Sequence, residues 1–259
     1  MIVCRAINPP TARRGAPRHR FPAGLTRGLP FLCAALLPLG GGFAAAQTIP
    51  SPYRPIEHRQ AASFFGGYLS LPTGSLNLGP RSGSLVGGRY ALEAGGPIFL
   101  EGLLSYLPTT RDVIDPRRQL GDRSLGETNV HLLMLDARLS FSLTGRRSWN
   151  RLSPHLSVGA GLAYDLGRGN ELEDVLLPED VFRFGVAFTA NAGTGVRFML
   201  GERLMAITDG TLRLWQLGTP AGFGDAGKRP DDEMDPLHAP EESEWVGGYG
   251  LSLSLAWRF

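Results

Sequence analysis

The stretch Leu251-Ser-Leu-Ser-Leu-Ala-Trp-Arg-Phe259 decides the fold class, because apolar and small or polar side chains alternate along it without a break. Successive side chains of a β-strand point to opposite faces, so the apolar residues all share one face. A strand that crosses a membrane between lipid and a polar lumen needs this pattern, with aromatic side chains at the interface. The stretch therefore predicts a membrane-spanning strand. Its apolar face comprises Leu251, Leu253, Leu255, Trp257 and Phe259.

The same two-residue period recurs through the chain and predicts eight strands. Segment 129–143 is among the clearest, and segment 203–217 is the weakest, because both of its faces are apolar. In segment 181–200 the pattern places Phe182 and Phe184 on one face with Phe188, opposite Arg183. The predicted strands are 63–71, 83–93, 97–107, 129–143, 155–166, 181–200, 203–217 and 245–259.

The connections between these segments alternate between long and short, with 144–154 as an intermediate exception. Long loops on one side and tight turns on the other are typical of an up-and-down membrane barrel. No run of 18 apolar residues follows position 46, and an open sheet edge cannot be satisfied in lipid. The expected fold is therefore all-β, an eight-stranded antiparallel up-and-down transmembrane β-barrel.

The first 46 residues have the features of a secretory signal peptide. Residues 1–27 contain six arginines and no acidic residue, and an apolar run and the sequence Ala-Ala-Ala-Gln follow. We expect cleavage between Ala46 and Gln47. Cleavage removes both cysteines and leaves 20 basic against 24 acidic residues, so the remaining net charge of −4 gives no argument for nucleic acid. The expected parts are a signal peptide (1–46), a proline-rich periplasmic segment (47–60) and the barrel (61–259).

Two motifs near the end of the chain carry a family resemblance. The segment Asn-Ala-Gly-Thr-Gly-Val-Arg-Phe (191–198), followed by Gly-Glu-Arg (201–203), resembles the penultimate hairpin of OmpA-like and OmpX-like outer-membrane barrels. The terminal Leu-Ala-Trp-Arg-Phe resembles their closing strand. The resemblance implies a place in the outer membrane of a Gram-negative-type bacterium, with both ends of the mature chain in the periplasm. It also implies assembly by periplasmic chaperones and the barrel assembly machinery, which would recognise the C-terminal strand as a signal.

The faces turned toward the predicted lumen carry charges of both signs. An eight-stranded barrel is just wide enough for its interior to be filled by side chains, and buried charges need partners. We therefore expect a plug of ion pairs, and a selectivity lining for a narrow channel is the alternative. The expected lumen network comprises Arg89, Glu101, Asp136, Arg138, Asp165, Arg183, Arg197 and Arg258.

Two weaker sequence patterns resemble parts of enzyme sites. His155-Leu-Ser157 is similar to the His-x-Ser arrangement of outer-membrane lipid A deacylases, but its flanking residues do not match that family. The acidic loop with Asp231, Asp232, Asp235 and His238 imitates an acid–histidine site, although such runs are more often solvated. We expect no catalytic residues, no metal and no cofactor.

The predicted long loops differ in charge. Loop 167–180 has a net charge of −4 and loop 218–244 a net charge of −6, which suits either solubility or contact with lipopolysaccharide or another surface ligand. Loop 108–128 belongs to the same set, and we expect loops 108–128 and 218–244 to tolerate shortening.

The sequence thus favours an integral outer-membrane barrel that contacts lipid and has a structural or surface-interaction role. A narrow porin for small solutes and an outer-membrane lipid-modifying enzyme remain the alternatives.

The closing strand generates a first testable prediction. Deleting Phe259, or Phe259→Asp, should reduce the amount of folded, heat-modifiable protein in the outer membrane far more than Arg258→Ser, because only Phe259 belongs to the apolar face. Equal recovery of the Phe259 deletion and the parent would contradict an assembly role for this strand.

Overall fold

The computed structural model describes residues 51–259 except 168–169, 226 and 231–233. The expected signal peptide, its cleavage site at Ala46 and Gln47, and the first residues of the proline-rich segment lie outside the described part. Asp231 and Asp232 also lie outside it. Within the described residues, no helix has the length and hydropathy needed to cross a membrane.

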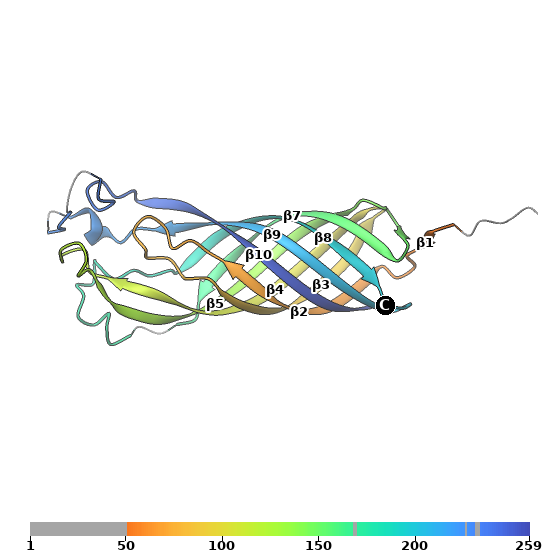
Figure 1. The fold of residues 1–259 in the computed structure, drawn as a ribbon, viewed down its shortest axis with the longest axis horizontal. Coiled ribbons are helices and arrows are strands. Elements are labelled where there is room, and N and C mark those ends of the chain that lie inside the picture. The colour runs from red at the N-terminus through yellow and green to blue at the C-terminus, as the bar shows by residue number, and fades with distance from the viewer. Residues whose placement is uncertain (1–50, 168–169, 226, 231–233) are drawn as a thin grey trace, which may run out of the picture. The chain divides into compact units, whose positions relative to one another are not determined.

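Eight antiparallel strands close into a barrel, which confirms the expected fold class. Their order around the wall is β2-β3-β4-β5-β7-β8-β9-β10, and pairing of β10 with β2 closes the ring. Figure 1 shows the strands winding obliquely around the barrel. The wall strands are β2 (Gln60–Ser70), β3 (Gly83–Gly95), β4 (Ile98–Ile114), β5 (Ser124–Ser142), β7 (Leu152–Asp165), β8 (Val186–Met199), β9 (Leu204–Gly218) and β10 (Ser243–Arg258).

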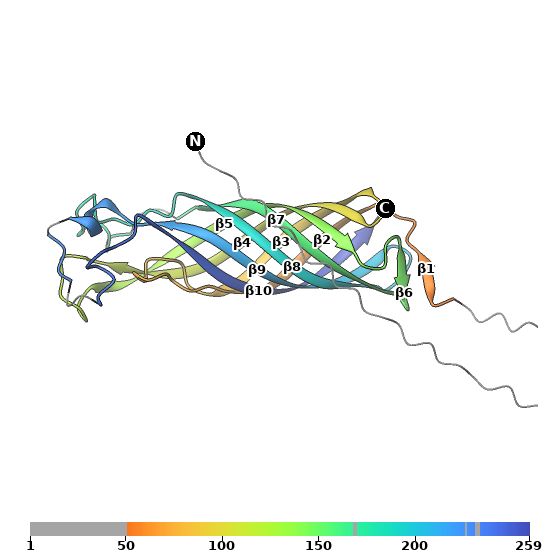
Figure 2. The same ribbon diagram turned by 90° about the horizontal axis from the view of Figure 1, so that it is seen from above.

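Two further strands lie outside the wall. β1 (Tyr53–Pro55) pairs with β6 (Arg147–Trp149), which lies within the connection that was predicted as a turn of intermediate length. Figure 2 shows β1 and β6 at the end of the barrel that also holds the C-terminus. We call this end the turn end and the opposite one, where the long loops gather, the loop end.

The outer surface of the wall is apolar. Leu135 of β5 is 60 % exposed and its cross-strand neighbour Leu162 of β7 is 49 % exposed. Exposed aromatic side chains include Tyr90, Phe141 and Trp257. So large an exposed apolar surface is stable only against lipid, and the wall therefore has the surface of a transmembrane barrel. The apolar face predicted for the last strand lies on this surface: Leu251, Leu253, Leu255, Trp257 and Phe259 are all exposed.

Strands β4 and β5 are longer than the sequence pattern indicated. Their ladder continues to the pair Ile114–Ser124, so most of the predicted loop 108–128 belongs to the wall and only residues 115–123 connect the strands. The premise that the whole segment lies outside the hydrogen-bonded wall is therefore wrong, and tolerance to shortening stays a prediction for residues 115–123. In the β4 sequence the strong alternation ends near Leu107. The β4–β5 hydrogen bonds continue past this point, because the strands extend beyond the part of the barrel that needs an apolar exterior.

Strand β8 is shorter than predicted, because the backbone turns at Gly185. This residue has φ = 57°, a left-handed conformation that favours glycine. The turn reverses the alternation: Phe182 and Phe184 lie inside the barrel mouth, whereas Val186 and Phe188 face outward. Phe182 and Phe184 were thus assigned to the wrong face.

The barrel interior has apolar layers at both ends and a polar layer between them. The layer at the loop end includes Leu107, Leu132 and Trp215, none of them measurably exposed. The layer at the turn end is formed by Met199, Met205, Ile207 and Ala256. This arrangement explains why both faces of the β9 sequence are apolar: one faces lipid and the other joins the two interior layers.

Two exposed leucines, one on β5 and one directly after it, test the membrane boundary. Leu135→Arg should lower the free energy of unfolding in lipid vesicles by roughly 2–4 kcal/mol, because it places a charge near the middle of the apolar wall. Leu143→Arg, one residue beyond β5 at the turn end, should cost about 0–1 kcal/mol. Equal costs at the two positions would contradict this placement of the membrane.

Candidate functional site

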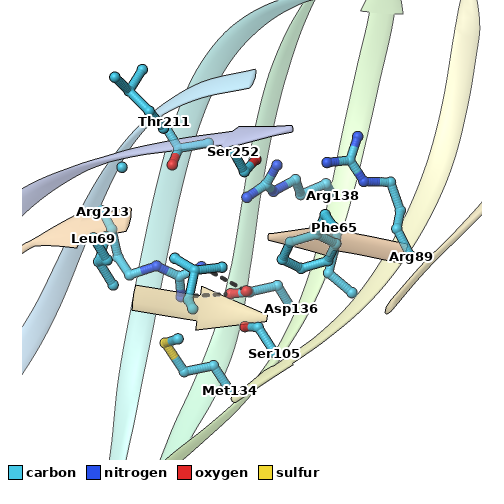
Figure 3. A pocket seen from close by; sticks show the side chains of 14 residues that line it. Phe65, Leu69, Arg89, Ser105, Met134, Asp136, Arg138, Thr211, Arg213 and Ser252 are labelled. Carbon is cyan, nitrogen blue, oxygen red and sulfur yellow. Dashed lines mark hydrogen bonds and ion pairs between the residues drawn. The ribbon is translucent and has the colours of Figure 1, made fainter. Parts of the chain in front are cut away.

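The polar layer of the interior is organised around Asp136 of β5. Arg213 of β9 donates from Nη1 to Asp136 Oδ1 at 3.0 Å and from Nη2 to Oδ2 at 2.7 Å (Figure 3). Asn191 and Thr189 of β8 each donate to Oδ1 at 3.2 Å. A buried carboxylate with a forked arginine and two neutral donors has its lone pairs well satisfied.

A second group of interior charges surrounds Asp209 of β9. Arg89 Nη2 lies 2.5 Å from one carboxylate oxygen, and His155 Nε2 lies 2.9 Å from the other. Since a carboxylate accepts only, His155 donates through Nε2. The two donors come from β3 and β7, so this group ties three strands together across the lumen.

A third interior pair joins Arg197 of β8 to Glu101 of β4 at 2.9 Å. Arg197 also donates to Ser140 Oγ at 2.8 Å, and its guanidinium lies over the Phe99 ring at 4.5 Å from the centroid. The pair therefore lies in the part of the polar layer nearest the turn end. With the two other groups it fills the central lumen with ion pairs.

The structure places the eight expected lumen residues in several settings. Arg89, Glu101, Asp136, Arg138 and Arg197 lie buried in the polar layer. Arg258, Asp165 and Arg183 lie outside this layer.

Arg258 points inward at the turn end but pairs with backbone. It donates to the carbonyl oxygens of Gly201 and Glu202 at 2.7 and 2.5 Å, and so holds the β8–β9 turn.

Asp165 and Arg183 do not join the network. Asp165, at the loop end of β7, accepts from the backbone N–H groups of His131 and Gly167. Arg183 is exposed and precedes β8, because the turn at Gly185 removes it from the strand. Asp165 is the last residue of β7, and Arg183 lies outside β8, so the alternation in the sequence reaches the edge of the wall at one position and passes it at the other.

The sequence prediction missed Asp209, Arg213 and, as a network member, His155. The first two belong to the segment with apolar residues on both faces, where no polar stripe was visible. Their spacing of four residues was the available signal, since it places both on the same face as Met205 and Ile207.

The long loops are tied together by arginines of β4 and of the connection 115–123. Arg111 pairs with Glu173, Arg117 pairs with Asp180 at 2.7 Å, and Arg123 pairs with Asp235 at 2.5 Å. The hydrogen bond to Asp180 raises the pKa of the Arg117 guanidinium above its usual value. These ion pairs partly neutralise the acidic excess of loops 167–180 and 218–244.

Apolar loop side chains fill the barrel mouth beneath these ion pairs. Phe223 of η1 (Ala221–Gly224) and Leu237 are buried against the loop-end layer, as are Leu78 and Phe182. Phe184 contacts Trp215 edge-on at 5.6 Å between ring centroids. The loops therefore form an ordered cap, which we define as residues 71–82, 115–123, 166–185 and 219–242 as far as they are described.

The turn end is covered in part by the segment before β2. Ile56 donates its backbone N–H to Arg146 O at 2.9 Å and packs against the turn-end layer. A cavity of about 520 Å³ remains beside it, lined by residues that include Arg54, His58 and Arg258.

The two sequence patterns that resemble enzyme sites lie in different parts of the structure. His155 is held by Asp209 inside the barrel, where Ser157 is also buried. In the acidic loop, Asp235 pairs with Arg123, and the backbone N–H of His238 donates to Asp235 O at 2.8 Å. Among the described residues, no group of three or more His, Cys, Asp or Glu side chains could hold a metal ion.

No protein-family model and no curated protein sequence matches this chain. The chain is similar to solved structures of small outer-membrane proteins. The N-terminal β-barrel domain of Pseudomonas aeruginosa OprF is 15 % identical, with 78 % of this chain and 98 % of that chain covered and a TM-score of 0.40. Neisserial surface protein A is 13 % identical, with coverages of 81 % and 98 % and a TM-score of 0.41. The outer-membrane protein AlkL is 17 % identical, with coverages of 80 % and 92 % and a TM-score of 0.40. The resemblance concerns the fold alone.

The Asp136–Arg213 pair can be tested by removing one or both charges. Asp136→Asn should lower the free energy of unfolding by about 3–5 kcal/mol, because it leaves Arg213 buried without a counter-charge. The double variant Asp136→Asn/Arg213→Met should be closer to the parent than the sum of the single variants. Asp122→Asn, whose exposed side chain only approaches Arg118, is the control and should change stability by about 1 kcal/mol or less. If the losses of unfolding free energy in Asp136→Asn and in Arg213→Met add up to the loss in the double variant, the two side chains are not coupled.

Proposed function

We propose that this chain is an integral outer-membrane protein with a structural or surface-interaction role and a closed lumen. The observation that carries the proposal is the filled interior. Ion pairs occupy the middle of the barrel, apolar layers lie on both sides, and loop side chains fill the mouth. An open pore needs a continuous wet path, and an interior packed in this way does not supply one.

The proposed orientation puts the loop end outside the cell and the turn end in the periplasm. Outer-membrane barrels carry long loops outside and short turns inside. In this orientation the mature N-terminus and the C-terminus are both periplasmic, which agrees with export through a cleaved signal peptide. The chaperones and the barrel assembly machinery would then meet the closing strand β10 on the periplasmic side.

The loop cap supports the surface-interaction part of the proposal. Its loops are held by ion pairs and a shared apolar base, yet Leu120 and Val175 are 58 % and 72 % exposed. Leu177 is exposed as well. Ordered loops that present apolar side chains among acidic residues provide a defined surface for a ligand outside the cell.

The two alternatives require features that compete with this arrangement. A narrow channel would have to break the Arg213–Asp136 pair or bypass it, and it would have to displace the loop-end layer. A lipid-modifying enzyme would need a nucleophile and a base that face lipid. His155 and Ser157 instead face the interior.

Planar-bilayer recording tests the closed lumen. The purified protein should give no stable, reproducible openings in concentrated potassium chloride, because no continuous aqueous path crosses the barrel. Reproducible openings whose conductance changes in Asp136→Asn, but not in the surface control Asp122→Asn, would favour the channel.

The alternative of a lipid-modifying enzyme is tested by comparing the lipids of cells with and without the protein. We expect unchanged lipid A and phospholipid acyl chains. A change in either that disappears in His155→Ala would overturn the non-enzymatic role.

A further inference from the structure

The interior charges do not balance. Among the described residues of the polar layer there are three buried carboxylates, Glu101, Asp136 and Asp209, and each has its own arginine partner. A fourth arginine, Arg138 of β5, is equally buried, at 5 % exposure. One positive charge is therefore left over in this layer.

Arg138 has no hydrogen bond or ion pair among the described residues, and its Nε is fully enclosed. Burial removes its guanidinium from water; Arg89 and Arg213 repel it, and Glu101 and Asp136 attract it without a hydrogen bond. Arg89 also has unused donors, because its Nε and Nη1 are buried without a hydrogen bond. Glu101 Oε2 lies 3.9 Å from Arg89 Nη1, which is beyond hydrogen-bonding distance. The two buried arginines thus offer several unused donors, and among the described residues Arg138 has no carboxylate partner.

These donors meet at an interior cavity of about 30 Å³ (Figure 3). Arg89 and Arg138 line it together with Ser105, Ser252 and apolar side chains such as Phe65. The Asp136–Arg213 pair also lines it, but the forked arginine already neutralises that carboxylate. A water molecule needs on the order of 10–15 Å³ of such space, so the cavity holds about two waters or one monatomic anion of halide size. A phosphate or a carboxylate-bearing metabolite is too large for it.

We propose that this cavity binds one halide ion, held by Arg138 and Arg89. Water could satisfy the donors but would leave the excess charge uncompensated in a low-dielectric interior, whereas an anion satisfies both. The halide completes the interior electrostatics as a fourth acidic side chain would. The inference is independent of the surface role proposed above.

Anomalous diffraction locates the ion directly. Crystals of the wild-type protein grown or soaked in bromide should show one anomalous peak inside the barrel, within hydrogen-bonding distance of the Arg138 guanidinium. An interior with water density only, and no anomalous peak, would overturn the proposal.

Thermal unfolding in detergent gives a second measure. Chloride should raise the unfolding temperature relative to gluconate at the same ionic strength, since gluconate does not fit the cavity. At a free chloride concentration ten times the dissociation constant, binding multiplies the folded-to-unfolded ratio about elevenfold.

Matched variants assign this effect to the cavity. Arg138→Gln should abolish the difference between chloride and gluconate, whatever it does to stability itself. Arg183→Gln removes an exposed arginine and should keep the difference. An equal chloride effect in all three proteins would show a general salt effect and refute the site. Should Arg138→Gln fail to fold, the bromide experiment on the wild type still decides.

Discussion

The narrowness of an eight-stranded ring is the constraint on which the rest of this structure depends. Once β10 pairs with β2, the lumen admits side chains and little else, so every inward residue must find a partner inside. Bulky apolar residues gather where loops and termini can cover them. Charged residues gather in the middle, where eight strands can supply partners from several directions. The layering of the interior follows from this single geometric limit.

The same limit explains how the wall and the interior depend on each other. Asp209 bonds to groups from β3 and β7, and Asp136 bonds to groups from β8 and β9. These bonds cross the lumen rather than running along the hydrogen-bond ladder. They fix the relative position of strands that are not neighbours in the wall, and a shift of one strand by a residue would break several of them at once.

The fold could be predicted from the sequence because lipid imposes a strict alternation on every wall strand, and Leu251 to Phe259 display it without interruption. Interior contacts were harder to predict, because the lumen imposes no such rule. Arg89, Glu101 and Asp136 stand out as charges in otherwise apolar strands, whereas Asp209 and Arg213 lie in a segment in which the interior itself is apolar at both ends. Asp165 and Arg183 were overpredicted for a related reason: alternation in the sequence does not show where the wall stops, and one left-handed glycine at position 185 is enough to end it.

The loop cap is built from contacts between segments that are distant in the chain. Arg123 and Asp235 are 112 positions apart, and Arg117 and Asp180 are 63 apart. Closing loops of that length costs entropy, and the paired wall strands bring these segments together. What the cap presents is therefore a discontinuous epitope. An antibody raised against any one loop peptide would meet its target in another shape on the folded barrel, and a binder selected on the folded barrel would recognise none of the peptides alone.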